Sequence, residues 1–218
     1  MQAKLKIVSK KKGEAVNKPT SKGDLTKSFI LDAALHLAGR DGLEGLTIGL
    51  IAERMSMSKS GVFAHFESRE SLQIEVIQEY NRRFKQFVFD PSMKQARGLP
   101  RLEMMLDLWI NLSISELTTG CIYISGAIEL DDRPGPVRDE LVQIVQNWRS
   151  ALKRAIQQSI EEGHLRKNCD PRLMLFAIYS AILGLQHDAR FLKEADSIDI
   201  VKQCLKQIID DRKPKLKV

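Results

Sequence analysis

The stretch SMSKSGVFAHF, residues 56–66, gathers side chains that can donate hydrogen bonds or carry positive charge. It surrounds only three large apolar residues, Val62, Phe63 and Phe66, with serines, a lysine and a histidine. Hydroxyl, ammonium and imidazole groups are donors that suit anions such as phosphate. A segment this polar does not suit an ordinary core helix, so its polar face is the first candidate for a binding surface.

Residue patterns typical of an active site are missing from the sequence. There is no Ser-His-Asp arrangement, carboxylate pair or phosphate-binding glycine loop in a supporting context. Cys121, Cys169 and Cys204 are far apart and form no CxxC pair, which argues against a structural zinc site and suits a reducing compartment. We therefore expect no catalysis, no metal and no cofactor. Cys121 could be a redox-sensing thiol or a buried structural cysteine.

The elements that position this stretch are predicted to be helices. A first helix follows from Ile30, Ala33, Ala34 and Leu37, which recur at i, i+3, i+4 and i+7. Thr47, Ser58 and Ser68 are suitable N-caps for a second, third and fourth helix. The fourth is expected to end at Asp90-Pro91, and its apolar side is predicted to consist of Leu72, Val76, Tyr80, Phe84 and Phe87.

Three short helices, with a tight turn between the second and third, are typical of a helix-turn-helix. Ala52 is small where the two helices must touch, and Val62 lies where an apolar residue must be buried. The turn at Ser56-Met57 often requires a positive φ, which glycine adopts most easily, so Ser56 implies some backbone strain. With Val62 and Phe66 packed inward, the other face of the third helix would point at a DNA major groove.

This interpretation assigns DNA-contacting roles to the exposed residues. Met57, Lys59, Ser60 and Phe63 would lie near base edges, and Gly61 would allow close approach. Hydroxyl and imidazole groups, together with the helix N-termini, would bind phosphates. The complete predicted set is Thr47, Met57, Ser58, Lys59, Ser60, Gly61, Phe63, His65 and Arg69.

Residues 26–72, TKSFILDAALHLAGRDGLEGLTIGLIAERMSMSKSGVFAHFESRESL, resemble the DNA-binding region of TetR-type transcriptional regulators. The features that carry the resemblance are Ala33-Ala34, Gly42, the capping Thr47, Ile51-Ala52, Ser58 to Gly61, Phe63-Ala64-His65-Phe66 and Ser68-Arg69-Glu70-Ser71-Leu72. One departure is Phe63, where the family usually has a tyrosine. The hydroxyl that would contact a phosphate is missing, so the ring could pack or touch a thymine methyl instead.

The resemblance implies an all-α protein with two domains. Residues 24–70 would form the three-helix DNA-binding domain, and residues 71–212 a C-terminal helical ligand-binding and dimerisation domain. It also implies a cytoplasmic bacterial homodimer that binds a near-palindromic double-stranded DNA operator, acts as a repressor and is released by a small-molecule effector. No apolar run is long enough to span a membrane. A helical protein-binding adaptor and a helical enzyme stay open as alternatives.

The net charge of +6 is concentrated at the N-terminus. Residues 1–23 hold seven lysines and one acidic residue, whereas residues 24–70 hold five basic and seven acidic residues. Because residues 1–23 lack apolar periodicity, we expect a disordered basic arm that either aids solubility or neutralises phosphates. Arg82, Arg83 and Lys85 are further expected sources of attraction to DNA, and residues 213–218 form a shorter basic tail.

Three helices of the second half are predicted from start signals and periodicity. Pro134-Gly135-Pro136 opens a long helix, Asp170-Pro171 starts another, and the last runs from about Ser197 to Asp211. The resemblance implies that the last two pair with their copies in a four-helix dimer interface, and the alternative is that they cover the core of one subunit. The predicted interface consists of Ala177, Ser180, Ala181, Gly184, Val201, Leu205 and Ile208.

Methionine and aromatic residues of the second half are candidates for an effector pocket, because such side chains form adaptable apolar walls. The alternative for each of them is a place in the ordinary core. The candidates are Met104, Met105, Leu108, Trp109, Leu112, Trp148, Phe176 and Tyr179.

Overall fold

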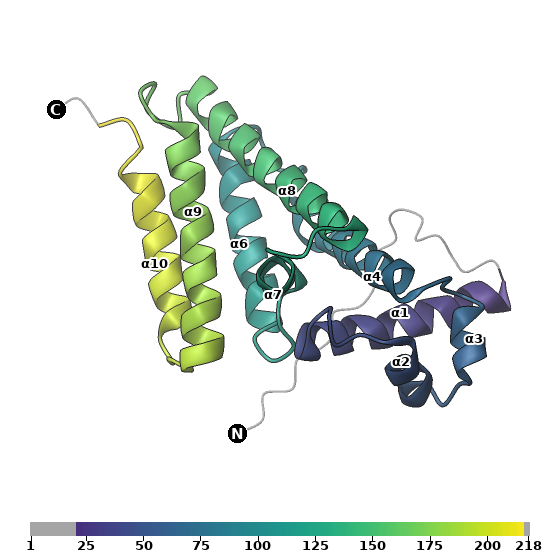
Figure 1. Ribbon diagram of the computed structural model, residues 1–218. Coiled ribbons are helices and arrows are strands. Elements are labelled where there is room, and N and C mark those ends of the chain that lie inside the picture. The colour runs from purple at the N-terminus through teal and green to yellow at the C-terminus, as the bar shows by residue number, and fades with distance from the viewer. Residues whose placement is uncertain (1–20, 216–218) are drawn as a thin grey trace, which may run out of the picture.

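The computed structural model describes residues 21–215, which form helices and no strands (Figure 1). The all-α class predicted from the sequence is confirmed. The elements are α1 (Lys22–Asp41), α2 (Ile48–Arg54), α3 (Lys59–Phe63), α4 (Arg69–Phe84), η1 (Lys85–Phe89), α5 (Asp90–Ser92), α6 (Leu99–Ser115), α7 (Ile122–Glu129), α8 (Pro136–Glu161), α9 (Pro171–Gln186), η2 (His187–Leu192) and α10 (Ser197–Asp210).

The two predicted tails fall mostly outside the described residues. The structure describes neither residues 1–20 of the expected arm nor residues 216–218 of the basic tail. Within the segment assigned to the arm, Ser21 caps α1 and Lys22 begins it, so α1 starts before the boundary expected at residue 24. The side chain of Ser21 accepts a hydrogen bond from the Asp24 N–H, and the Asp24 carboxylate accepts one from the Ser21 N–H.

Four helices begin at the caps that the sequence predicted. The hydroxyl oxygens of Thr47, Ser58 and Ser68 accept backbone N–H groups at 3.1, 3.0 and 3.0 Å. The carboxylate of Asp170 accepts the Arg172 N–H at 2.7 Å. Each bond satisfies an N–H group that the first turn of a helix leaves without an internal partner.

The molecule consists of a small head and a larger helical body, joined through α4. Helices α1, α2 and α3 form the head, while α9 and α10 lie side by side at the far end of the body (Figure 1). Helix α4 packs against α1 in the head and against α8 in the body. Helix α4 therefore connects the head to the body.

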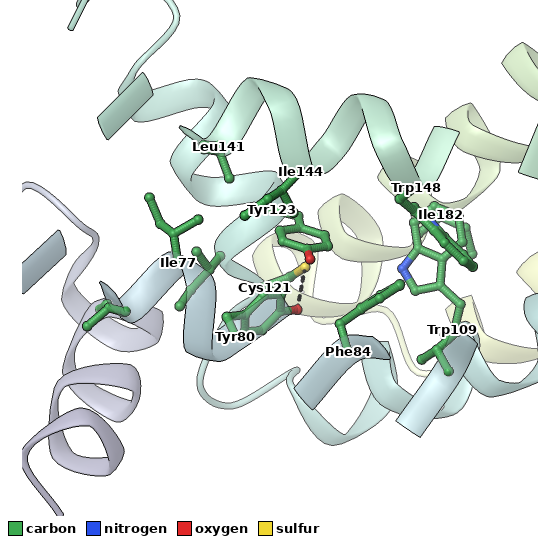
Figure 2. Close-up of a cluster of buried hydrophobic side chains, with 14 of the residues drawn as sticks. Ile77, Tyr80, Phe84, Trp109, Cys121, Tyr123, Leu141, Ile144, Trp148 and Ile182 are labelled. Carbon is green, nitrogen blue, oxygen red and sulfur yellow. Dashed lines mark hydrogen bonds between the residues drawn. The ribbon is translucent and has the colours of Figure 1, made fainter. Parts of the chain in front are cut away.

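An aromatic cluster fills the centre of the body (Figure 2). The buried rings of Phe84 and Trp148 meet edge to face with centroids 4.8 Å apart, and Trp109 meets Trp148 in the same way at 5.4 Å. Such pairs add about 0.5–1.5 kcal/mol each beyond the burial of their area. The centre of the body is therefore packed with rings from α4, α6 and α8.

The end of α4 differs from the prediction. The helix continues beyond Phe84 through the π-helical segment η1 into α5, and Pro91 stands in the first turn of α5 rather than ending the helix. A π-helical turn holds more residues than an α-helical turn, so it rotates the later side chains around the axis. Phe87, expected on the buried side, is exposed, and Val88 is buried in its place.

Candidate functional site

The recognition helix α3 is held by its inner face and exposes its outer face. Val62 and Phe66 are buried, as predicted, and pack the segment against the head. Lys59, Ser60 and Phe63 are exposed, and Phe63 is 48% accessible. An exposed phenylalanine between a lysine and polar residues is suited to contact with a base edge or a thymine methyl.

The turn between α2 and α3 has the strained geometry that the sequence indicated. Ser56 has φ 53°, one of two non-glycine residues with positive φ among residues 21–215. The turn is closed by hydrogen bonds from the Ser56 N–H to the Glu53 carbonyl at 3.1 Å and from the Met57 N–H to the Ala52 carbonyl at 2.9 Å. These bonds set the angle between the two helices of the helix-turn-helix.

Gly49 contributes to the binding surface, although the sequence reasoning missed it. A Cβ atom at Gly49 would lie 3.4 Å from Cε of Lys59 and 3.8 Å from its Nζ. The lysine side chain therefore lies against the first turn of α2, next to the exposed Thr47. The sequence feature that could have indicated this close approach is a glycine inside a segment of helical periodicity.

The remaining predicted phosphate contacts are placed around the start of α3. Thr47 and Ser58 are exposed, and each oxygen accepts a capping bond. The Thr47 hydroxyl hydrogen can still donate, and the Ser58 hydroxyl shares a hydrogen bond of 3.0 Å with the Ser60 hydroxyl. Met57, Gly61 and His65 are half-buried beside them. The surface is thus a polar patch with two helix N-termini, an arrangement that favours anions.

Arg69, one of the predicted DNA contacts, forms hydrogen bonds within the subunit. Its Nε donates to the Leu46 carbonyl at 3.0 Å and its Nη2 donates to the Glu44 carbonyl. Both bonds turn the guanidinium toward the loop before α2, so the residue predicted to contact DNA holds the start of α4 to the head.

The basic residues at the end of α4 are paired with carboxylates. Arg82 and Arg83 both pair with Glu79 at 2.7 Å, Arg83 pairs with Asp32 as well, and Lys85 pairs with Asp90. Arg82 stands about 20 Å along α4 from Arg69. The positive charges of these side chains are compensated by carboxylates and lie far from α3.

The start of α1 lies beside the recognition helix. The Lys27 ammonium lies 5.3 Å from the ring centre of Phe66 and pairs with Glu75 at 2.6 Å. The first turns of α1 therefore lie near the segment that carries α3 and Phe66.

An apolar cavity of about 580 Å³ lies between α7, α8 and α9. It is lined by Cys121, Tyr123, Ile124, Ser125, Ala127, Ile128, Asp131, Val145, Arg149, Tyr179, Leu183, Gln186, His187, Arg190 and Phe191. Of the residues predicted to form a pocket, Tyr179 belongs to this lining. Volumes of this size suit small organic ligands.

The other predicted pocket residues have different places. Met105, Trp109 and Trp148 are buried in the core, and Met104 and Leu108 are half-buried on α6. Leu112 lines a smaller cavity of about 330 Å³ between α1, α4 and α6. Phe176 is exposed on the outer side of α9. The reason is that the edge-to-face rings fill the centre of the body, which displaces the open space toward α7 and α9.

Polar groups are few around the apolar cavity, and two of them are guanidinium groups. The Arg149 guanidinium lies 4.5 Å from the ring centre of Tyr179. Gln186 is buried, and its Nε2 has no hydrogen-bond partner. A ligand with an apolar body and a polar end would complement these groups.

A buried polar cluster lies behind the cavity wall. The Tyr80 hydroxyl donates to Glu116 Oε2 at 2.9 Å and lies 3.2 Å from Cys121 Sγ (Figure 2). Burial raises the pKa of the Glu116 carboxyl to about 7 and that of the Cys121 thiol to about 12. Because a reactive cysteine needs its thiolate form, the environment of Cys121 favours the structural role over the redox one.

The head and the body also meet directly. The Glu129 carboxylate, at the end of α7, accepts the Glu44 N–H at 3.0 Å, and Arg133 pairs with the Glu44 carboxylate at 2.6 Å. Near the end of α1, a Cβ at Gly39 would lie 2.5 Å from the Thr119 carbonyl oxygen. The last turn of α1 and the loop before α2 are therefore in contact with the elements around α7.

The outer side of α9 is unusually apolar for a surface. Leu173, Phe176 and Leu183 are exposed there, together with Ile200 on the neighbouring α10. Among the predicted interface residues, Ser180 is exposed and Ala177, Ala181, Gly184 and Ile208 are half-buried. A Cβ at Gly184 would have no atom within 4 Å. Exposed apolar stripes of this kind mark interaction surfaces.

Val201 and Leu205 do not belong to that surface. They are buried within the subunit, where α10 packs against α9. The alternative prediction therefore holds for Val201 and Leu205: they cover the core of their own subunit. The reason is that the apolar face of α10 packs against α9.

Neither a membrane helix nor a metal cluster is found in the part of the chain that the structure describes. Across residues 21–215, every helix is too short or too polar to cross a bilayer. The same residues contain no group of three or more histidine, cysteine or carboxylate side chains arranged to hold a metal ion.

Two family models match the two parts of the molecule. The model described as bacterial regulatory proteins, tetR family, matches residues 30–76, and that described as tetracyclin repressor-like, C-terminal domain, matches residues 98–205. The chain is 23% identical over 133 residues to the HTH-type transcriptional repressor DhaR of Mycobacterium sp. strain GP1, a match that spans 61% of this chain and 66% of DhaR. It is 18% identical over 153 residues to the fatty acid metabolism regulator protein of Bacillus subtilis strain 168, spanning 70% and 77%.

Solved structures share the fold over nearly their whole length. A TetR transcriptional regulator from Chloroflexus aurantiacus J-10-FL superposes with a TM-score of 0.77 at 22% identity, covering 86% of this chain and 96% of that one. FadR from Bacillus subtilis, solved in complex with stearoyl-CoA, has a TM-score of 0.69 at 16% identity, covering 85% and 97%. Regulators rather than enzymes are thus the relatives, as the sequence predicted. With a helix-turn-helix head and a helical body that both match one family, the chain belongs to the TetR family of transcriptional regulators.

Proposed function

We propose that this TetR-family protein is a homodimeric repressor that leaves its DNA operator when a small molecule enters the cavity between α7, α8 and α9. The observation that carries the proposal is the double role of α7. Ile128 lines the cavity, and the next residue, Glu129, accepts the N–H of Glu44 in the head. A ligand that displaces α7 therefore acts directly on the loop that precedes the helix-turn-helix.

The DNA-reading step uses the outer face of α3. Lys59, Ser60 and Phe63 would enter a major groove, while the hydroxyls of Thr47 and Ser58 bind the flanking phosphates. Residues 24–70 bring no surplus positive charge to this surface, because their acidic residues outnumber the basic ones. The seven lysines of residues 1–23 are the natural source of the missing attraction, and removal of residues 1–20 would then flatten the salt dependence of binding.

The dimer would form across the outer sides of α9 and α10. Leu173, Phe176 and Leu183 would be covered by the same stripe of a second copy, and Gly184 leaves room for a close helix approach. A twofold interface places the two α3 helices on half-sites about one helical turn, roughly 34 Å, apart. A near-palindromic operator follows from this symmetry.

Release requires that the ligand binds a conformation with separated heads better than the DNA-bound conformation. Two relatives support the assignment. DhaR is named a transcriptional repressor, and Bacillus subtilis FadR was solved with stearoyl-CoA. The apolar lining of the present cavity is compatible with an effector that has a substantial apolar part.

The test begins with selection of DNA fragments from a genomic library by the purified full-length protein. Recovered fragments should share a near-palindromic motif, and binding to a synthetic copy should weaken as salt is raised. Light scattering should give a dimer both free and on DNA. Recovery of unrelated fragments with no shared motif would refute the proposal and favour the adaptor alternative.

A further inference from the structure

One side chain, Arg190, contacts both the cavity and the head. It lies in η2, directly after α9, and forms part of the cavity lining. Its Nη2 donates to the carbonyl oxygen of Gly39 at 3.4 Å. Gly39 belongs to the last turn of α1, the first helix of the head. A group bound in the cavity is thus separated from the head by a single guanidinium.

The passage that Arg190 occupies exists because Gly120 leaves it open. Gly120 has φ 89°, and a Cβ there would lie 1.8 Å from Nη1 of Arg190 and 2.3 Å from the Gly39 carbonyl oxygen. Any larger residue at position 120 would therefore displace the Arg190 guanidinium from the Gly39 carbonyl.

The charges around the cavity indicate the class of ligand. Two guanidinium groups, from Arg149 and Arg190, stand against one carboxylate, from the exposed Asp131. His187 is engaged with Asp188 at 2.9 Å. The remaining wall is mostly apolar in area, with hydroxyl groups from Tyr123, Ser125 and Tyr179. The excess of guanidinium groups over carboxylates complements an amphipathic acid, a molecule with an apolar body and one carboxylate.

The contact between Arg190 and the head is weak enough to be exchanged. Its 3.4 Å length exceeds the usual 2.7–3.2 Å of an N–H···O bond. A carboxylate offers a guanidinium two parallel, shorter bonds and an opposite charge, whereas Gly39 offers one long bond to a neutral carbonyl. A carboxylate bound in the cavity would therefore replace the Gly39 carbonyl as the hydrogen-bond partner of the Arg190 guanidinium.

We propose that Arg190 is the coupling residue of this regulator: it binds the acidic end of an amphipathic ligand and, in doing so, gives up its contact with α1. The inference rests on the proposed function, since it names the ligand class and the trigger of that same cavity. An apolar molecule of equal length fills the cavity without moving the guanidinium. Binding and release are therefore separable in this protein.

The experiment uses dodecanoate, dodecanol and dodecylammonium below their aggregation concentrations. Calorimetry measures their affinity for the full-length protein, and fluorescence anisotropy measures binding to the operator. Dodecanoate is expected to weaken operator binding by at least about fivefold. Dodecanol is expected to bind without changing operator affinity, and dodecylammonium to bind most weakly. The variants are Arg190→Met and Arg190→Lys, with Arg154→Met, an exposed position on α8 that does not line the cavity, as the matched control.

Because Arg190→Met lacks the contact with Gly39 from the start, it should bind the operator more weakly than the wild type without ligand. It should bind dodecanoate and dodecanol alike, and neither should weaken its operator binding further. Arg190→Lys should recover part of the preference for the acid, and Arg154→Met should behave as wild type. The inference is overturned if ligand-free Arg190→Met binds the operator as tightly as the wild type, if dodecanoate weakens its operator binding further, if dodecanol releases DNA from the wild type, or if no acid binds. A wild type that binds no operator would instead refute the proposed function. Unchanged melting temperatures show that the variants fold.

Discussion

A hydrogen bond between the side chain of Glu129 and the backbone of Glu44 joins the body to the head. The Glu129 carboxylate at the end of α7 accepts the Glu44 N–H at 3.0 Å, and Arg133 pairs with the Glu44 side chain. The carboxylate also lies against Gly42, where an added Cβ would be 2.6 Å from one of its oxygens. The loop before α2 is therefore fastened to a helix that lines the cavity.

Replacing Glu129 with alanine should uncouple the two parts. The loss of one acceptor for a half-buried N–H is expected to lower the free energy of unfolding by about 1–2 kcal/mol. The effect of ligand on operator affinity should shrink more than ligand binding itself. Urea denaturation and anisotropy titrations with and without ligand measure both quantities. Glu103→Ala, an exposed carboxylate on α6, is the control, and an unchanged ligand effect in Glu129→Ala would contradict this coupling.

Alanine at Lys59 or Phe63 should weaken binding to the operator by about 1–3 kcal/mol each, because each side chain is exposed on the reading face of α3. Stability should stay within about 0.5 kcal/mol of wild type, since neither residue belongs to the core. Anisotropy with the selected operator and with a scrambled duplex separates specific from non-specific binding. Lys153→Ala on α8 removes an exposed lysine far from the head as a control. Undiminished specificity would show that α3 does not read the sequence.

A charge on the outer side of α9 should dissociate the dimer. Phe176 is 66% exposed in the subunit, so Phe176→Glu leaves the subunit core intact but places a carboxylate in the proposed interface. Light scattering should report a monomer at micromolar concentration, with helix content unchanged by circular dichroism. Phe29→Glu changes an equally exposed ring, 60% accessible, on α1 and should remain dimeric. A dimeric Phe176→Glu would place the interface elsewhere.

Stability should depend on pH through Glu116. Burial raises the pKa of its carboxyl in the folded protein to about 7, against an ordinary value of 4.5. Between these values the folded state binds the proton more tightly than the unfolded state, so stability falls as the pH rises from about 4.5 through about 7. The stabilising effect of the proton is complete below pH 4.5 and lost above pH 7.

The variant Glu116→Gln removes this titration and keeps an oxygen that can accept from Tyr80. At pH 8 it should be more stable than the wild type by about 2–3 kcal/mol, and at pH 4.5 the two should be equal. Urea denaturation at both pH values measures the difference, with Glu103→Gln as the exposed control. A constant difference at the two pH values would rule out the linkage.

Glycine at position 56 should stabilise the helix-turn-helix. Ser56 has φ 53°, a conformation in which a Cβ is strained and glycine is not. The expected gain for Ser56→Gly is about 0.5–1 kcal/mol in unfolding free energy, reduced by the greater freedom of glycine in the unfolded chain. Thermal denaturation measures it. Ser60→Gly, inside α3, should destabilise instead, and a loss of stability in Ser56→Gly would mean that the serine side chain has its own role.

The features that were predictable from the sequence are the local ones. Thr47, Ser58 and Ser68 cap their helices because a hydroxyl three residues before a free N–H meets it in any such chain. Val62 and Phe66 are buried because the spacing of a helix-turn-helix leaves no other place for them. These positions require no knowledge of distant residues.

The features that were missed depend on contacts between distant residues. Arg69 has the right charge for DNA, but the Leu46 carbonyl takes its guanidinium. Trp109 and Trp148 are aromatic residues of the kind that line ligand pockets, but their rings pack against each other in the core. Phe87 follows the helical period until η1 shifts it. A sequence pattern names the type of side chain, whereas its partner is decided by the packing of separate helices.

The recognition helix consists of five residues, Lys59–Phe63, held by one serine cap and by the inward side chains Val62 and Phe66. A helix this short is not stable alone, so its shape comes wholly from what lies beneath it. Exchanges at the outward residues Lys59 and Phe63 should therefore cost little stability, whereas replacement of Val62 or Phe66 would remove the packing on which the shape of the helix depends.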